Sequence, residues 1–195
     1  MRKPVNTYNY FPEIDLSDLK SDEEFYYLFW LCELCEYGYI ETAEYESETF
    51  TLTNGYTKFY EKQLKTKVKR EEETIAKPIV YTPDFKIYWT EKAVGVFYMD
   101  YTSDCKLMHG HHPLYSLGCD LVSYTEVKGS FDPNNTTRAT KQKIAWLFDK
   151  HKVYTNIHFV PDIFKKTFTP KEFMVTKKQR KLKDLKYDVK TIEDF

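Results

Sequence analysis

The sequence predicts an α/β fold with a central mixed β-sheet flanked by helices, followed by a basic C-terminal extension. Three observations indicate it: a capped apolar helix near the N-terminus, strand-like segments in the middle, and an amphipathic helix that precedes another strand. The 195 residues, 42% of them hydrophobic and 17% aromatic, are enough for one packed domain. We expect this domain over residues 1–161, and a helical extension over residues 162–195 packed on or next to it.

The first helix is indicated by a capping box. Ser21 to Glu24 has the form S-x-x-E directly before an apolar run that ends near Gly38. On a helical wheel Glu24 lies at the centre of the buried face. Cys32 and Cys35 fall in the middle of this helix, so we interpret them as core residues and not as a redox pair.

The later elements follow from periodicity and turn residues. The strand of residues 81–89 alternates Phe85, Ile87 and Trp89 on one face, and a strand over 93–101 is expected to pair with it. The charged stretch 65–77 is interpreted as an exposed turn or mobile loop. A strand-like region is expected over 49–60, with a turn at Asn54-Gly55, and further strands over 121–127 and 154–160. A helix is expected over 136–150, and its inward side chains are Ile144, Leu147, Phe148 and His151. The capping box from Thr169 to Glu172 predicts a basic C-terminal helix.

The charge is distributed unevenly along the chain. The net charge of −1 combines −9 over residues 1–56 with +10 over residues 138–190. A protein meets nucleic acid with one face, so the basic third could supply a DNA-binding surface. For any single lysine, a solvated surface position is the simpler interpretation.

Several classes of protein are excluded by what the sequence lacks. No apolar stretch is long enough for a membrane span, and the first residues lack the apolar region of a signal peptide, so we expect a cytoplasmic protein with no membrane partner. The six glycines do not cluster into a phosphate-binding loop, which predicts no nucleotide cofactor. Four scattered cysteines do not make a disulfide framework.

Two short segments carry the candidate chemistry: Pro83-Asp84, and Glu126-Val127-Lys128-Gly129. On a strand, Glu126 and Lys128 point to the same side. Burying a carboxylate beside an ammonium group is costly unless an ion or another partner compensates. A second carboxylate from a neighbouring strand completes a pocket of hard oxygen ligands that suits Mg²⁺. The chemistry that fits is metal-assisted hydrolysis of a phosphodiester, with Lys128 orienting or deprotonating the attacking water.

These residues resemble the PD-(D/E)XK nuclease superfamily, and within it the small phage endonucleases related to endonuclease I and the Holliday-junction resolvases. The motif order matches from residue 20 to 160: the Ser21–Glu24 helix ending in Gly38-Tyr39-Ile40, Tyr81-Thr82-Pro83-Asp84-Phe85, Glu126 to Gly129, and a Lys-rich helix. The resemblance implies a restriction-endonuclease-like core and a DNA endonuclease that uses Mg²⁺, with Mn²⁺ as a substitute. The spacer between Asp84 and Glu126 is long, and residues 102–120 look like an insertion.

The resemblance also implies individual roles. Asp84 and Glu126 would be metal ligands with the Val127 carbonyl, and Lys128 would be the catalytic lysine. Glu24 would be an additional helix carboxylate at the metal, or only the second half of its capping box. The alternative for Asp84, Glu126 and Lys128 is a structural ion pair at a strand edge.

DNA and a second copy of the chain are the expected partners. Lys141 is the preferred phosphate contact on the Lys-rich helix, with Arg138 and Lys143 beside it, although a surface lysine explains each of them as well. Resolvases of this kind act as symmetric dimers, and the aromatic residues from Phe25 to Trp30 are a candidate dimer surface. Two alternative functions stay open: a restriction- or transposase-type nuclease acting on duplex DNA, and a non-catalytic nucleic-acid-binding or virion module.

A zinc site is a weaker alternative. Cys105, His109, His111, His112 and Cys119 lie within 15 residues of one another, but their spacing matches no standard zinc finger. A zinc-stabilised adaptor built around this segment would contain stoichiometric zinc.

Overall fold

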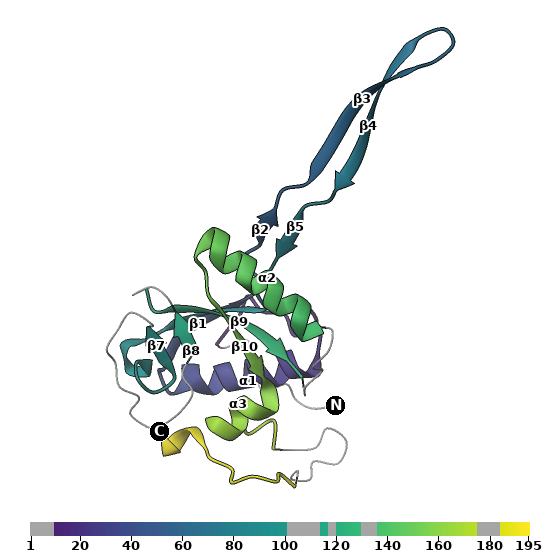
Figure 1. Cartoon of the computed structure of the whole chain (residues 1–195). Coiled ribbons are helices and arrows are strands. Elements are labelled where there is room, and N and C mark those ends of the chain that lie inside the picture. The colour runs from purple at the N-terminus through teal and green to yellow at the C-terminus, as the bar shows by residue number, and fades with distance from the viewer. Residues whose placement is uncertain (1–9, 101–113, 117–119, 130–135, 175–183) are drawn as a thin grey trace.

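A four-stranded mixed sheet forms the centre of the molecule. The computed structural model describes residues 10–100, 114–116, 120–129, 136–174 and 184–195. The strand order is β1 (Ile40–Tyr45), β6 (Phe85–Trp89), β9 (Val122–Lys128) and β10 (Thr155–Phe159). The first three strands run antiparallel, and β10 lies parallel to β9. Helices α1 (Asp22–Glu36) and α3 (Val160–Lys166) cover one face, and α2 (Thr136–His151) covers the other (Figure 1). The predicted α/β architecture with a mixed sheet between helices is therefore confirmed.

Helix α1 forms as the capping box predicts and packs the main core. The Ser21 hydroxyl accepts a hydrogen bond from the Glu24 N–H, which satisfies one free donor of the first turn. The helix is buried over much of its circumference, and the side chains from Tyr26 to Trp30 lie inside this chain's own core. They are therefore unavailable as a dimer surface, contrary to our expectation. Cys32 is buried as predicted and Cys35 is partly buried, and both are free thiols.

A smaller apolar cluster lies on the opposite face of the sheet. It joins α2 to a pair of short strands, β2 (Phe50–Thr53) and β5 (Ile79–Tyr81), which are antiparallel to each other. Ile144 and Leu147 of α2 are buried in this cluster, as predicted. Phe148 is exposed, contrary to prediction, and the exposed His151 contacts the Thr51 carbonyl at 3.0 Å.

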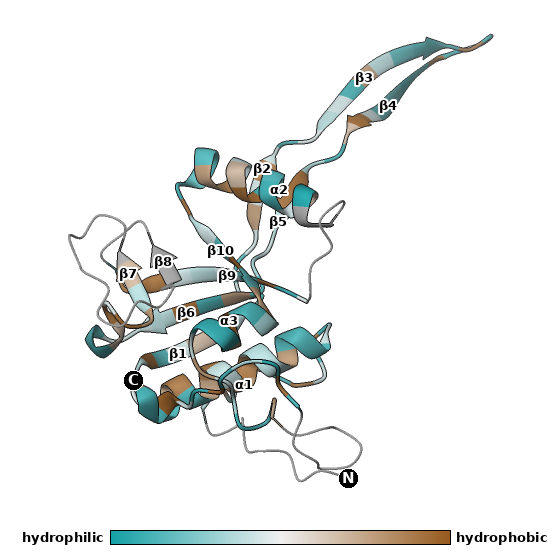
Figure 2. Ribbon diagram, turned by 60° about the horizontal axis from the view of Figure 1, so that its bottom comes forward, coloured by the Kyte–Doolittle hydropathy of each residue, from teal (hydrophilic) through white to brown (hydrophobic). Residues whose placement is uncertain are grey.

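The segment predicted as a loop over residues 65–77 is instead half of a long β-hairpin. Strands β3 (Tyr56–Gln63) and β4 (Val68–Ala76) pair along their whole length and project away from the rest of the molecule (Figures 1 and 2). We call residues 56–76 the arm. At its base, a Cβ at Gly55 would lie only 2.9 Å from Pro78 Cδ, so the segments on either side of the arm approach this closely only because Gly55 has no Cβ. The predicted turn at Asn54-Gly55 is therefore a break between β2 and β3.

Three further segments differ from what the sequence indicated. Strand β1 was not predicted; it pairs with β6, whereas residues 93–101 do not. That segment instead makes a 3₁₀ turn, η2 (Glu91–Ala93), and continues to β7 (Tyr98–Asp100), which pairs with β8 (Leu114–Ser116). Pro161 does end the preceding strand, but it also begins α3, because proline suits the first turn of a helix.

The predicted basic C-terminal helix is not formed where the structure can test it. Residues 171–174 make turns, and residues 175–183 lie outside the described residues. The final segment is irregular and ends in η3 (Ile192–Asp194). Phe168 and Ile192 are both buried in the main core, so the extension is packed on it. No helix within the described residues has the length and apolar character needed to cross a membrane.

Candidate active site

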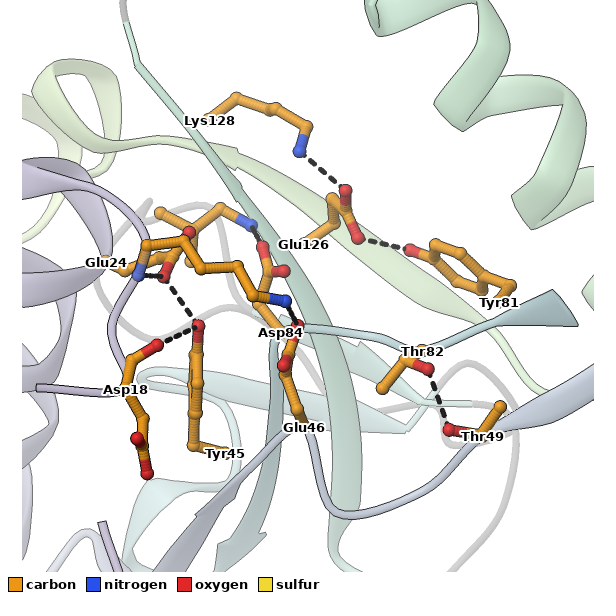
Figure 3. Close-up of polar contacts among 12 residues, drawn as sticks. Asp18, Glu24, Tyr45, Glu46, Thr49, Tyr81, Thr82, Asp84, Glu126 and Lys128 are labelled. Atoms are coloured by element: carbon orange, nitrogen blue, oxygen red, sulfur yellow. Dashed lines mark hydrogen bonds and ion pairs between the residues drawn. The ribbon is translucent and has the colours of Figure 1, made fainter. Parts of the chain in front are cut away.

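The strand register brings the two predicted acidic residues together. The last pair between β6 and β9 is Phe85 with Thr125, so one step further along the register Asp84 falls opposite Glu126. Side chains alternate between the faces of a strand, and Phe85 points into the core under α1. Asp84 and Glu126 therefore share the other face, which is the face that α2 covers further along the sheet. Figure 3 shows the two carboxyl groups and Lys128 gathered there.

Asp84 is held by the neighbouring strand. Its Oδ2 accepts a hydrogen bond from the backbone N–H of Val127 at 2.6 Å. Burial, and after it the negative charge of Glu126, raise the pKa of Asp84 to about 7, although the Val127 hydrogen bond and the Lys128 charge oppose this shift. A carboxyl group with such a pKa gains most from a nearby cation, because a cation stabilises its ionised form.

Glu126 is buried, and both of its carboxylate oxygens have partners. Lys128 donates from Nζ to Oε1 at 2.6 Å, and the Tyr81 hydroxyl donates to Oε2 at 2.6 Å. Lys128 and Glu126 are two residues apart on β9, so their side chains lie on the same face as predicted. In the state shown, the ammonium group of Lys128 is the charge that compensates Glu126.

Glu24 approaches the site from the N-terminus of α1. Its Oε2 accepts hydrogen bonds from the Lys20 backbone N–H at 2.7 Å and from the Tyr45 hydroxyl at 2.8 Å. The carboxylate thus binds a donor one residue before the Ser21 N–H that a standard capping box uses. Its negative charge also acts on Asp84, which lies between Glu24 and Glu126 in Figure 3. The structure therefore places Glu24 beside the site and shows it helping to hold the start of the helix.

Besides Lys128, a second basic group, Lys20, lies near these acids. Lys20 pairs with Glu46, and the charges of both Glu24 and Asp84 also act on its ammonium group. The pKa of Lys20 is raised, chiefly by its hydrogen bond to Glu46. The site thus holds more acidic than basic side chains, which favours an added cation.

The predicted DNA contacts lie on α2, which covers the same face of the sheet as the site. Arg138 and Lys141 are exposed, and Lys143 is half-buried. The Val127 side chain points the opposite way, into the main core. Arg138 and Lys141 are therefore accessible to an anionic ligand.

Sequence reasoning missed the tyrosines that position the acids. Tyr81 lies in the quoted Tyr-x-Pro-Asp segment, but nothing in its spacing predicts a hydrogen bond to Glu126, 45 residues away. Tyr45 lies on β1, an unpredicted strand whose sequence IETAEY has only two buried residues. For both, the contact arises from strand pairing between distant segments.

A metal site at these residues would rest on few protein ligands. Within the described ranges, no three His, Cys, Asp or Glu side chains are arranged as a metal-binding group. Asp84 and Glu126 therefore offer two carboxylates, and Mg²⁺ is commonly held by one or two carboxylates with water completing its shell. The proposed zinc residues Cys105, His109, His111, His112 and Cys119 lie outside the described residues.

Comparison with protein-family models, with curated proteins and with solved structures finds no match to this chain. The geometry of the site is therefore the basis for inferring a function.

Proposed function

We propose that this protein is a Mg²⁺-dependent DNA endonuclease that hydrolyses phosphodiester bonds, with branched DNA as its expected substrate. One observation carries the proposal. Asp84 and Glu126 lie opposite each other on adjoining strands and share a face, with the Lys128 ammonium group 2.6 Å from Glu126. This arrangement is what the resemblance to PD-(D/E)XK nucleases requires of these three residues.

The donor set fits a hard divalent cation. Burial, and after it the negative charge of Glu126, raise the pKa of Asp84, and two such close carboxyl groups are the environment that Mg²⁺ or Mn²⁺ stabilises. Asp84, Glu126 and the Val127 carbonyl would hold the ion, with Glu24 beside them. When bound, the ion lowers the pKa of a water ligand and neutralises charge on the phosphate.

Lys128 has two roles in this proposal. Without metal, its ammonium group binds Glu126 Oε1 and prevents an unpaired buried charge. If a cation were bound to that oxygen, the Lys128 ammonium group would remain on the same face of β9, where it would orient water or stabilise phosphate oxygens. Lys128 therefore has a structural role without metal and a proposed catalytic role with metal.

Two other functions use the same residues. A restriction- or transposase-type nuclease would have identical chemistry and act on ordinary duplex DNA, because substrate shape is read outside the metal pocket. A non-catalytic nucleic-acid-binding or virion module would keep the ion pairs only for structure. Comparing cleavage of branched and duplex DNA distinguishes the proposed enzyme from a duplex nuclease. Metal-dependent turnover distinguishes it from a non-catalytic module.

The test compares cleavage of a four-way junction, a fork, a linear duplex and a single strand, each with Mg²⁺, with Mn²⁺ and with a chelator. We expect metal-dependent cleavage, fastest on the junction or the fork. Asp84→Asn, Glu126→Gln and Lys128→Met should each lower the rate by at least about 100-fold.

The matched control is Tyr88→Phe. Tyr88 lies on β6 and bonds Glu44, so this change removes a hydroxyl from the same sheet without touching the site. The control should cleave at the wild-type rate. Cleavage by Asp84→Asn at the wild-type rate, or no cleavage of any substrate by the wild type with either metal, contradicts the proposal.

A further inference from the structure

The arm is a two-stranded ribbon, and none of the described helices or strands packs on either of its faces. Strands β3 and β4 pair from Tyr56 with Ala76 to Gln63 with Val68, and almost every side chain in them is exposed. An isolated two-stranded hairpin is marginally stable in water and usually needs further strands or a covering layer. At about 3.4 Å per residue, the nine residues of β4 present an edge of about 30 Å of unpaired backbone donors and acceptors.

The arm also exposes large apolar side chains. Phe59 is 75% exposed, and Tyr56, Val68 and Ile75 each expose more than half of their surface. Exposed apolar side chains gathered on one projecting element are typical of an interaction surface, because they lower the solubility of a protein when no partner covers them. This composition indicates a protein partner along the ribbon.

The charge on β4 is divided into two halves. Its N-terminal half carries Lys69 and Arg70, and directly after them come Glu71, Glu72 and Glu73. An antiparallel copy of such a strand places the basic half of each chain against the acidic half of the other. Strand β3 has no comparable division, since its charges alternate as Lys58, Glu61 and Lys62.

We propose that the arm is a self-association surface, in which β4 pairs antiparallel with β4 of a second copy about a two-fold axis. Opposed residues in such a pair must point to the same face. A register centred on Glu71 meets this condition and sets Arg70 against Glu72 of the second copy and Lys69 against Glu73. Each of these pairs occurs twice, once on either side of the axis.

The two Glu71 residues meet at the axis in this register, and each is already compensated within its own chain. Lys69 Nζ lies 3.2 Å and Lys62 Nζ lies 4.0 Å from the Glu71 carboxylate. The result is a four-stranded ribbon with the two copies of the core at opposite ends. This surface is separate from the acidic site, so it does not depend on the hydrolytic function.

Nucleic acid is the competing partner, because the tip of the arm is basic. Lys65 and Lys67, at the turn, have no ion-pair partner within the described part of the chain. A phosphate backbone would be repelled by Glu71 to Glu73, however, and it offers nothing to Phe59 or Ile75. A second copy satisfies the acidic run and covers apolar side chains as well.

The experiment exchanges charges across the proposed pair and measures mass by light scattering and sedimentation over a concentration series. Arg70→Glu and Glu72→Arg each create like-charge pairs and should weaken self-association at least about tenfold. A mixture of these two variants should form a heterodimer, because each glutamate then faces an arginine. The double variant with both changes should dimerise like the wild type.

Glu61→Lys is the matched control. Glu61 pairs with Arg70 within the arm at 3.2 Å, so this change disturbs the same arginine while leaving the charges of the β4 edge intact. It should retain the dimer. The proposal is overturned if the wild type is monomeric, if the two single variants fail to associate on mixing, or if Arg70→Glu lowers DNA affinity with no change in mass.

Discussion

Asp84 shows how position changes the chemistry of an ordinary side chain. The same carboxyl group on the surface would be ionised at neutral pH, but here burial and the charge of Glu126 make ionisation costly. The Val127 N–H offsets part of that cost through a hydrogen bond to Oδ2. The residue is therefore poised to bind a proton or a cation, and the two compete for it.

This competition predicts a pH-dependent stability. The pKa of Asp84 in the folded chain, about 7, lies above its ordinary value of 3.8, so the folded state binds the proton more tightly and loses stability as the pH rises between these values. We therefore compare the free energy of unfolding of Asp84→Asn with that of the wild type in the absence of divalent metal. The advantage of the variant should be about 1–3 kcal/mol larger at pH 8 than at pH 5. Urea unfolding at both pH values measures this, and an equal difference at each pH contradicts it.

Tyr81 is the clearest positioning residue in the site. Its hydroxyl fixes Glu126 Oε2 at 2.6 Å, and removing such a partner of a ligand commonly weakens metal binding by tenfold or more. Tyr81→Phe should shift the Mg²⁺ dependence of cleavage by about tenfold, with Tyr88→Phe as the unaffected control. Calorimetric Mg²⁺ binding gives a second measurement that needs no turnover, and unchanged binding in Tyr81→Phe argues against this role.

Helix α1 connects the core to the site at the level of whole elements. Its apolar side chains pack against those of β6, and its first turn places Glu24 where its charge acts on Asp84. The cap is the link between these roles, because the Ser21 hydroxyl holds the Glu24 N–H at 3.2 Å. Loosening the cap should therefore affect both stability and the position of Glu24.

We expect Ser21→Ala to lower the free energy of unfolding by about 1 kcal/mol, since the Glu24 N–H loses its acceptor. Chemical denaturation measures the change. Thr66→Ala, at the exposed tip of the arm, is the control and should leave stability within about 0.5 kcal/mol of the wild type. Equal effects of the two changes would show that the cap contributes nothing.

The distribution of charge belongs to the whole molecule. The acidic N-terminal third supplies α1 and Glu24, and the basic third from residue 138 supplies α2 and the extension. Helix α2 lies on the face of the sheet that holds Asp84 and Glu126 (Figure 1). A DNA strand bound at the acidic site would thus meet cationic groups on the same face of the sheet, and these would offset repulsion between carboxylates and phosphates.

This arrangement predicts the salt dependence of DNA binding, measured with a chelator so that no cleavage occurs. The logarithm of the affinity should fall linearly with the logarithm of the salt concentration. The change of Arg138 and Lys141 together to Gln should reduce that slope by about 2. Lys92→Gln is the control, because Lys92 lies at η2, where its ammonium group is bound to the Tyr37 carbonyl. An unchanged slope in the double variant places the DNA elsewhere.

The parts of the fold that could be read in advance are those with a local signal. The capping box and apolar run located α1, alternation located β6, and the Glu126-x-Lys128 spacing placed both side chains on one face of β9. Such patterns depend only on neighbours along the chain, because backbone geometry alone decides which side chains share a face. The pairing of Asp84 with Glu126 was predicted from the family resemblance, and the register of β6 and β9 now supports it.

Tertiary structure decided the rest. Residues 65–77 carry too many charges to predict a strand, yet they pair with β3, where cross-strand partners such as Glu61 and Arg70 compensate one another. Strand β1, the hydrogen bond from Tyr81 to Glu126 and the raised pKa of Asp84 were also not predictable from local sequence. Hydrogen bonds between distant strands and the loss of water on burial are properties of the assembled molecule, and no local run of residues contains them.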